Sequence, residues 1–236
     1  PDPKAAMDDD WREALSSAIR ERAGELPSYH RLAGFEISRE KLSVAQAAMK
    51  QVFVTLGREI RSQLCAFIAG DLSYYLAHNE PREHMATGEM VKGSDIDIII
   101  ILSESLPDDV QDRIDTEMTA LKNFYLRHPE HRHEIDFICK RKSVMERQFQ
   151  YSDIHDKIAS KIAYESMFLG GSLTLYMEVR DAMIRTGVDQ LIEADFEHAL
   201  KDRKHAMNTL LQASSDGLDE ETRSLFYFSQ ERVEFS

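Results

Sequence analysis

Short runs of hydrophobic residues alternate along this chain with segments whose hydrophobic residues recur every three or four positions. The first pattern is typical of buried strands and the second of amphipathic helices. The apolar runs, two of them rich in isoleucine, predict three strands, at 65–69, 93–102 and 133–139. The helical spacing predicts helices at 38–61 and 108–127, and Asp8-Asp9-Asp10 can cap an earlier helix that ends near Gly24.

The pattern after residue 140 predicts helices alone. Residues 145–150 are expected to be a connector, and Gly170-Gly171 a turn between two helices. The predicted helices lie at 153–168, 172–185, 195–213 and 220–231. We therefore expect an α+β fold: a first domain at 1–150, with a mixed sheet and flanking helices whose core spans about 50–140, and a helical domain at 151–236.

Two carboxylates stand at the head of the run Ile96–Leu102. Strand side chains alternate between faces, so Asp95 and Asp97 are predicted to point the same way. Paired carboxylates at a strand end repel each other and are costly to bury, and a divalent cation removes that cost. The pair therefore predicts a magnesium site that holds a nucleotide phosphate. The alternative is a strand whose exposed face is simply acidic.

A third carboxylate lies on the next predicted strand. Asp136 shares a face with Glu134, while His133, Ile135 and the apolar residues that follow share the other face. If the two strands are neighbours, Asp136 lies beside Asp95 and Asp97. Three carboxylates around one cleft suit one or two magnesium ions and a triphosphate.

With Asp95-Ile96-Asp97 on one strand and Asp136 on a later one, the chain resembles the nucleotidyltransferase superfamily typified by DNA polymerase β, over about residues 50–140. The resemblance implies Mg²⁺-dependent transfer (Mn²⁺ is possible) of a nucleoside monophosphate, with AMP from ATP expected first, to a hydroxyl, with release of pyrophosphate. The resemblance also implies that Asp95 and Asp97 hold one metal, and that Asp136 completes a second metal site and helps to deprotonate the acceptor. The acceptor stays open: a small molecule, a protein, tRNA or another nucleotide.

The same resemblance implies a phosphate-binding turn before the Asp pair. Gly70 follows the first strand, and a helix at 71–78 would present its first amides to the phosphates, helped by Ser73. Gly70-Asp71 stands where the family has Gly-Ser, and Gly93-Ser94 is a rival for that motif. Basic side chains expected to reach the triphosphate are Lys92, from a flap at 85–92, and the helical pair Lys157 and Lys161, whose alternative is a solvated helix face.

Composition narrows the possible partners. The net charge of −13 argues against a broad nucleic-acid-binding face. No apolar stretch approaches the roughly 20 residues of a membrane helix, and no signal peptide is recognisable, so a cytoplasmic protein without membrane contact is expected. The histidines at 128, 131 and 133 are expected in an exposed loop.

Two other kinds of function stay open. The first alternative is a catalytically silent nucleotide sensor or regulatory protein of the same fold. The second is a helical interaction protein whose acidic strand is incidental. Nucleotide binding without pyrophosphate release would indicate the sensor, and failure to bind nucleotide would indicate the interaction protein.

Overall fold

The computed structural model describes the backbone of residues 9–212 and the side chains of residues 32–209. This chain forms two compact units. Among the described residues, the first unit combines the chain up to Val144 with the segment Glu165–Glu178, and the second combines Met145–Tyr164 with the chain from Val179 to Gln212. The predicted helix at 220–231 lies outside the described residues.

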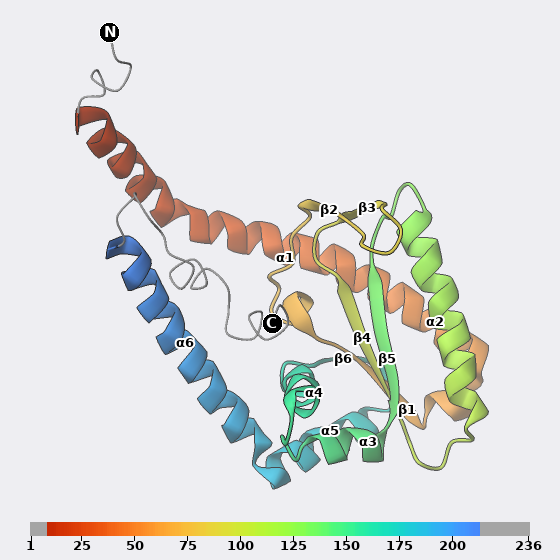
Figure 1. Cartoon of the computed structure of the whole chain (residues 1–236). Helices are drawn as coiled ribbons and strands as arrows, with labels where there is room; N and C mark the ends of the chain where they lie inside the picture. The colour runs from red at the N-terminus through yellow and green to blue at the C-terminus, as the bar shows by residue number, and fades with distance from the viewer. Residues whose placement is uncertain (1–8, 213–236) are drawn as a thin grey trace. The chain divides into compact units, whose positions relative to one another are not determined.

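The first unit contains the sheet and two long helices (Figure 1). Its helices are α1 (Asp9–Arg61), interrupted by non-helical dihedral angles at Gly57, and α2 (Asp109–Arg127), and a short 3₁₀ turn, η2, covers Gly70–Leu72. Its strands are β1 (Leu64–Ile68), β2 (Pro81–Glu83), β3 (Met90–Lys92), β4 (Ile96–Leu102), β5 (Ile135–Arg141) and β6 (Met167–Gly171).

Four strands form a mixed sheet in the order β5-β4-β1-β6, and β2 and β3 form a separate hairpin. Strand β1 is antiparallel to both β4 and β6, whereas β4 and β5 are parallel. A parallel pair needs a crossover connection, and α2 supplies it between β4 and β5. The α+β class and mixed sheet expected from the sequence are confirmed.

The hydrophobic core lies between one face of the sheet and helices α1 and α2. Alternate residues of β4, from Ile96 to Leu102, face this core, as do Leu64, Ala66 and Ile68 of β1. Six residues of α2 at helical spacing are buried: Val110, Ile114, Met118, Leu121, Tyr125 and Leu126. Because strand side chains alternate, the residues on the other face of β4 include Asp97, so the core packing itself orients the acidic face.

The remaining helices belong partly or wholly to the second unit. They are α3 (Lys142–Gln148), α4 (Ile154–Tyr164), α5 (Leu173–Thr186) and α6 (Val188–Gln212), and the division between the units falls inside α3 and α5. Within the second unit Arg180 donates to the carbonyls of Ala163 and Tyr164, both at 2.7 Å, which joins α5 to the end of α4. No helix in the described part of the chain is long and apolar enough to span a membrane.

Several local predictions were wrong. Helix α1, interrupted at Gly57, replaces the two predicted N-terminal helices, and the helix predicted at 71–78 is replaced by the short 3₁₀ turn at Gly70–Leu72. The predicted connector contains α3. The segment 167–171, expected to end a helix and turn, is strand β6, because it finds a pairing partner in β1. Strand pairing joins residues far apart in sequence, so helical periodicity did not reveal it.

Gly93 lies where a side chain has no room, directly before the acidic residues. Its φ is +49°, and an added Cβ would lie 2.0 Å from the carbonyl oxygen of His78. We expect Gly93→Ala to lower the free energy of unfolding by about 3 kcal/mol, because backbone strain and overlap add. Gly88→Ala is the control: φ is +68°, but the nearest atom is a side-chain oxygen at 3.5 Å, so a loss of about 1 kcal/mol is expected. Urea unfolding measures both, and equal losses would contradict the prediction.

Candidate metal and nucleotide site

The acidic site lies where β4 and β5 begin. Asp97 pairs directly with Asp136 in the parallel register. The amide of Ile96, the first residue of β4, donates to the carbonyl of Glu134 at 3.0 Å. The two segments therefore already lie side by side one residue before β5 begins. Parallel strands begin at the same edge, which explains why carboxylates from distant parts of the sequence meet here.

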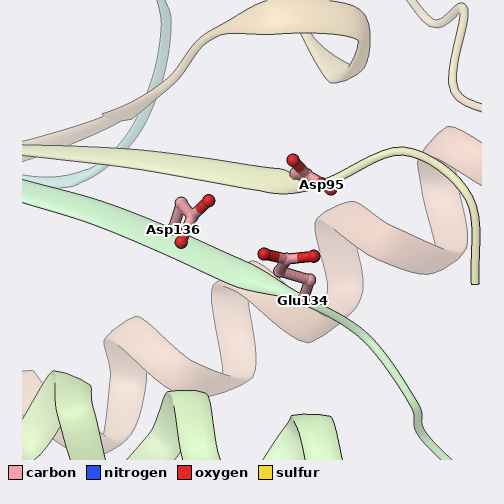
Figure 2. Close-up of side chains that lie close together, drawn as sticks. All are labelled: Asp95, Glu134 and Asp136. Atoms are coloured by element: carbon pink, nitrogen blue, oxygen red, sulfur yellow. The ribbon is translucent and has the colours of Figure 1, made fainter. Parts of the chain in front are cut away.

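Three carboxylates converge closely enough to share a cation. Oxygen atoms of Asp95, Glu134 and Asp136 all lie within 4.8 Å of one another. Figure 2 shows these three side chains gathered at the start of the two strands. Glu134 is almost buried, whereas the side chain of Asp95 is 36% exposed, so the cluster is open on one side.

Asp97 is the carboxylate most affected by its surroundings. Burial, followed by the negative charges of Asp136, Asp71 and Glu134, raises the pKa of Asp97 to about 6. No ion pair in the described part of the chain involves Asp97. A bound cation would favour the ionised form of this carboxylate, because an opposite charge nearby lowers a carboxyl pKa.

Two basic side chains already neutralise part of the cluster. Arg82, from the hairpin strand β2, forms ion pairs with Asp95 and, at 2.7 Å, with Glu134. Lys122, from α2, forms an ion pair with Asp136. Neither residue follows from the sequence pattern, because each comes from a different element and meets the carboxylates only in the folded chain.

Glu134 belongs to the site but was not predicted as a ligand. Its position two residues before Asp136 places both on one strand face, so the signal was present in the sequence. The three clustered carboxylates offer only oxygen ligands, and Asp97 lies next to Asp136 in the strand register but outside this cluster. Oxygen-only sites suit Mg²⁺ and Mn²⁺, and the close approach of the three clustered carboxylates fits such an ion.

Gly70 brings the chain close to the cluster. Its φ is +68°, and an added Cβ would lie 2.7 Å from Oδ2 of Asp97. The Ser73 hydroxyl donates to the Gly70 carbonyl at 2.7 Å and closes the 3₁₀ turn. The turn is too short to provide the predicted helix N-terminus at 71–78, so phosphate binding by Gly70 and Ser73 stays a prediction without that helix.

Ser94 and Asp71 belong to one hydrogen-bond network. The Ser94 hydroxyl donates to Asp71 at 2.9 Å and accepts from the His78 amide at 3.1 Å. Asp71 therefore ties the 3₁₀ turn to the segment that leads into Asp95. A role for Ser94 in nucleotide binding stays a prediction.

The three predicted lysines differ in their surroundings. Lys92 donates to the Glu130 carbonyl at 3.2 Å and lies 3.9 Å from the Glu40 carboxylate. Lys157 contacts Asp195 at 3.4 Å and the Tyr151 ring at 4.9 Å, within the second unit. Lys161 lies in the last turn of α4, also in the second unit. Their contact with nucleotide stays a prediction.

A buried lysine supports the segment that carries Asp95. Lys41 of α1 is fully buried and donates to the carbonyls of Lys92 at 2.6 Å and Ser94 at 2.8 Å. Its Nζ also lies 3.4 Å from Nδ1 of His133. Burial, followed by the charges of Lys41 and Lys92, lowers the pKa of His133 to about 4, so the imidazole is neutral at pH 7. The prediction of an exposed loop is therefore wrong for His133.

Comparison with known proteins yields fold neighbours of low similarity. No family model matches the chain, and no curated protein matches it. A crystal structure of a toxin-antitoxin with AMP-PNP shows a TM-score of 0.32 and 10% identity, covering 70% of this chain and 98% of that chain. A crystal structure of a mutant of the toxin-antitoxin MntA-HpeT shows a TM-score of 0.31 and 8% identity, with the same coverage.

Proposed function

We propose that this chain is a metal-dependent nucleotidyltransferase that moves a nucleoside monophosphate, AMP first among the candidates, from a nucleoside triphosphate to a hydroxyl, with release of pyrophosphate. The observation that carries the proposal is the convergence of Asp95, Glu134 and Asp136 within 4.8 Å beside Asp97. Such a concentration of carboxylates at the start of two parallel strands is costly for folding, and a bound cation would lower the part of that cost that Arg82 and Lys122 do not already offset.

Asp95, Glu134 and Asp136 would hold the metal, with Asp97 beside them on β4; Asp95 directly precedes β4 and Glu134 directly precedes β5. Bound Mg²⁺ would neutralise triphosphate oxygens and stabilise the attacking and leaving oxygens in an in-line displacement. Asp136 forms an ion pair with Lys122 in the structure. Release from that ion pair would let Asp136 orient the acceptor hydroxyl and receive its proton.

The left-handed turn at Gly70 would bring backbone against the nucleotide. A side chain at Gly70 would meet Asp97, so only glycine permits this approach. The closeness of residue 70 to Asp97 supports a phosphate position beside both the turn and the carboxylates. Contacts from Ser73, Ser94 and Lys92 of the first unit are part of the proposal, and nucleotide contacts of Lys157 and Lys161, in the second unit, stay predictions from the sequence.

Pyrophosphate release from each of the four nucleoside triphosphates, with Mg²⁺ or Mn²⁺, tests the proposal, and mass spectrometry of the products identifies the base and any self-made oligonucleotide. Extract fractions supply candidate acceptors. We expect Asp95→Asn to lower release by at least about 100-fold, since it removes a charge that stabilises the transition state. Asp112→Asn, an exposed carboxylate in the first turn of α2, should retain full activity.

Other outcomes would be equally informative. Full activity of Asp95→Asn would contradict the assignment of this carboxylate. Nucleotide binding by the wild type, without pyrophosphate release under any acceptor condition, would favour a silent sensor. Absence of metal-dependent nucleotide binding would contradict both the transferase and the silent sensor.

A further inference from the structure

The hairpin of β2 and β3 is attached to the acidic site mainly through side chains. Its two strands pair only with each other in the described sheets. On the β3 side, Lys41 binds the Lys92 carbonyl at 2.6 Å, and the Lys92 amide donates to the Arg132 carbonyl at 2.9 Å. Those bonds hold β3 to the body of the first unit.

The β2 side is held by charge. Arg82 forms ion pairs with Asp95 and Glu134, and its Nε donates to the Gly93 carbonyl at 3.0 Å. Two residues further along, Nε2 of His84 lies 3.3 Å from the other carboxylate oxygen of Glu134. Residues two apart in an extended chain share a face, so Arg82 and His84 both approach the acidic cluster.

Arg82 therefore occupies the position that a cation bridging Asp95 and Glu134 would take. A carboxylate oxygen that accepts from a guanidinium cannot at the same time approach a metal freely, and two positive charges at one place repel each other. The hairpin contact and cation binding therefore compete for the same two carboxylates.

We propose that Arg82 is a latch on the metal site: its guanidinium pairs with Asp95 and Glu134 in the absence of a cation, and cation binding displaces it and releases the β2 edge of the hairpin. The inference rests on the proposed metal site and adds a regulation of that site. The Arg82 ion pairs stabilise the carboxylate cluster without a metal. Their loss on metal binding would couple metal entry to movement of the β2 segment beside the proposed nucleotide position.

The latch is tested by measuring Mn²⁺ binding to the whole chain in the absence of nucleotide. The electron paramagnetic resonance signal of the free ion reports how much Mn²⁺ stays unbound. We expect Arg82→Ala to bind Mn²⁺ about 10-fold more tightly than the wild type, since a competing charge is removed at a partly exposed site. Arg82→Lys keeps the charge but loses the guanidinium fork, so its affinity should lie between those of the wild type and Arg82→Ala. Arg113→Ala, an exposed arginine on α2, is the matched control and should leave affinity unchanged.

A second readout uses the wild type alone and does not depend on how well a variant folds. Hydrogen exchange of the amides of residues 82–84 should accelerate when Mn²⁺ is added, while the amides of β4 stay protected. Unchanged or weaker Mn²⁺ binding by Arg82→Ala, or a β2 edge that stays equally protected in saturating Mn²⁺, would overturn the latch.

The outcomes separate the latch from the transferase. Mn²⁺ binding that tightens in Arg82→Ala, in a protein that never releases pyrophosphate, would support the latch and refute the reaction. Pyrophosphate release with Mn²⁺ affinity indifferent to Arg82 would support the reaction and refute the latch. Failure of both the wild type and Arg82→Ala to bind Mn²⁺ would overturn the latch together with the metal site beneath it.

Discussion

Asp97→Asn is expected to abolish transferase activity and at the same time to stabilise the protein without metal. The pKa of Asp97 is raised to about 6, above the ordinary aspartate value of 3.8, chiefly by burial. At pH 7 the folded protein therefore holds an ionised carboxylate that its surroundings disfavour. Asparagine has nearly the same shape and no charge, so the cost disappears, and we expect a gain of about 2 kcal/mol in the free energy of unfolding.

The pH dependence of this gain has a definite sign. Between pH 3.8 and about 6 the folded wild type binds a proton at Asp97 more tightly than the unfolded chain does. This residue therefore makes the wild type less stable as pH rises through that window. The gain from Asp97→Asn should be fully present above about pH 6 and should vanish near pH 4.

Urea unfolding with a chelator at pH 7.5 and at pH 4, beside pyrophosphate release, measures both effects. Release should fall by at least about 100-fold in Asp97→Asn. Added Mg²⁺ should stabilise the wild type, since a ligand that binds only the folded state raises stability, and should stabilise the variant much less. Asp112→Asn serves again as the exposed control. A variant less stable than the wild type at pH 7.5, or one that keeps its activity, would contradict this account.

Lys41→Met is expected to lower the free energy of unfolding by about 4 kcal/mol and to weaken metal binding. The substitution keeps most of the buried volume but leaves the carbonyls of Lys92 and Ser94 without their charged donor. Hydrogen bonds to charged groups contribute about 1.5–3 kcal/mol each, and unsatisfied buried acceptors are costly. Since these carbonyls belong to the segment leading into Asp95, the metal site should loosen as well.

Urea unfolding and Mn²⁺ binding measure the two consequences. Lys50→Met is the matched control: Lys50 lies on the same helix, α1, but is exposed, so a change below about 0.5 kcal/mol is expected. Lys41→Arg would test whether charge alone suffices in a fully buried position. Equal stability of Lys41→Met and the wild type would show that these carbonyls find other donors.

Much of the acidic strand arrangement was predictable because it depends on local periodicity. The two-residue spacing predicted that Asp95 and Asp97 share one strand face and Glu134 and Asp136 another, since side chains alternate in any strand. In the structure β4 begins at Ile96 and β5 at Ile135, so Asp95 and Glu134 lie directly before the strands. The crossover helix α2 was equally predictable, because its buried positions recur at helical spacing. The short turn at 70–72 was not predictable, because the sequence does not reveal that a longer helix there would have no surface to pack against.

The neighbours of the carboxylates depend on contacts between distant segments. Arg82 and Glu134 are 52 residues apart in sequence, and Lys41 and Ser94 are 53 apart. Strand β6 was missed for a similar reason, since Gly170 and Gly171 resemble a turn until they are paired with β1.

The sequence by itself determined which residues form β4, α2 and β5 and which faces of the strands carry acid, because those properties follow from the spacing of side chains along one segment. Only the tertiary structure decided that β4 and β5 are parallel and in register at Asp97 and Asp136, and that Arg82 and Lys122 neutralise the cluster. Pairing register and long-range ion pairs arise from the packing of separate elements around one core, and no local pattern encodes them.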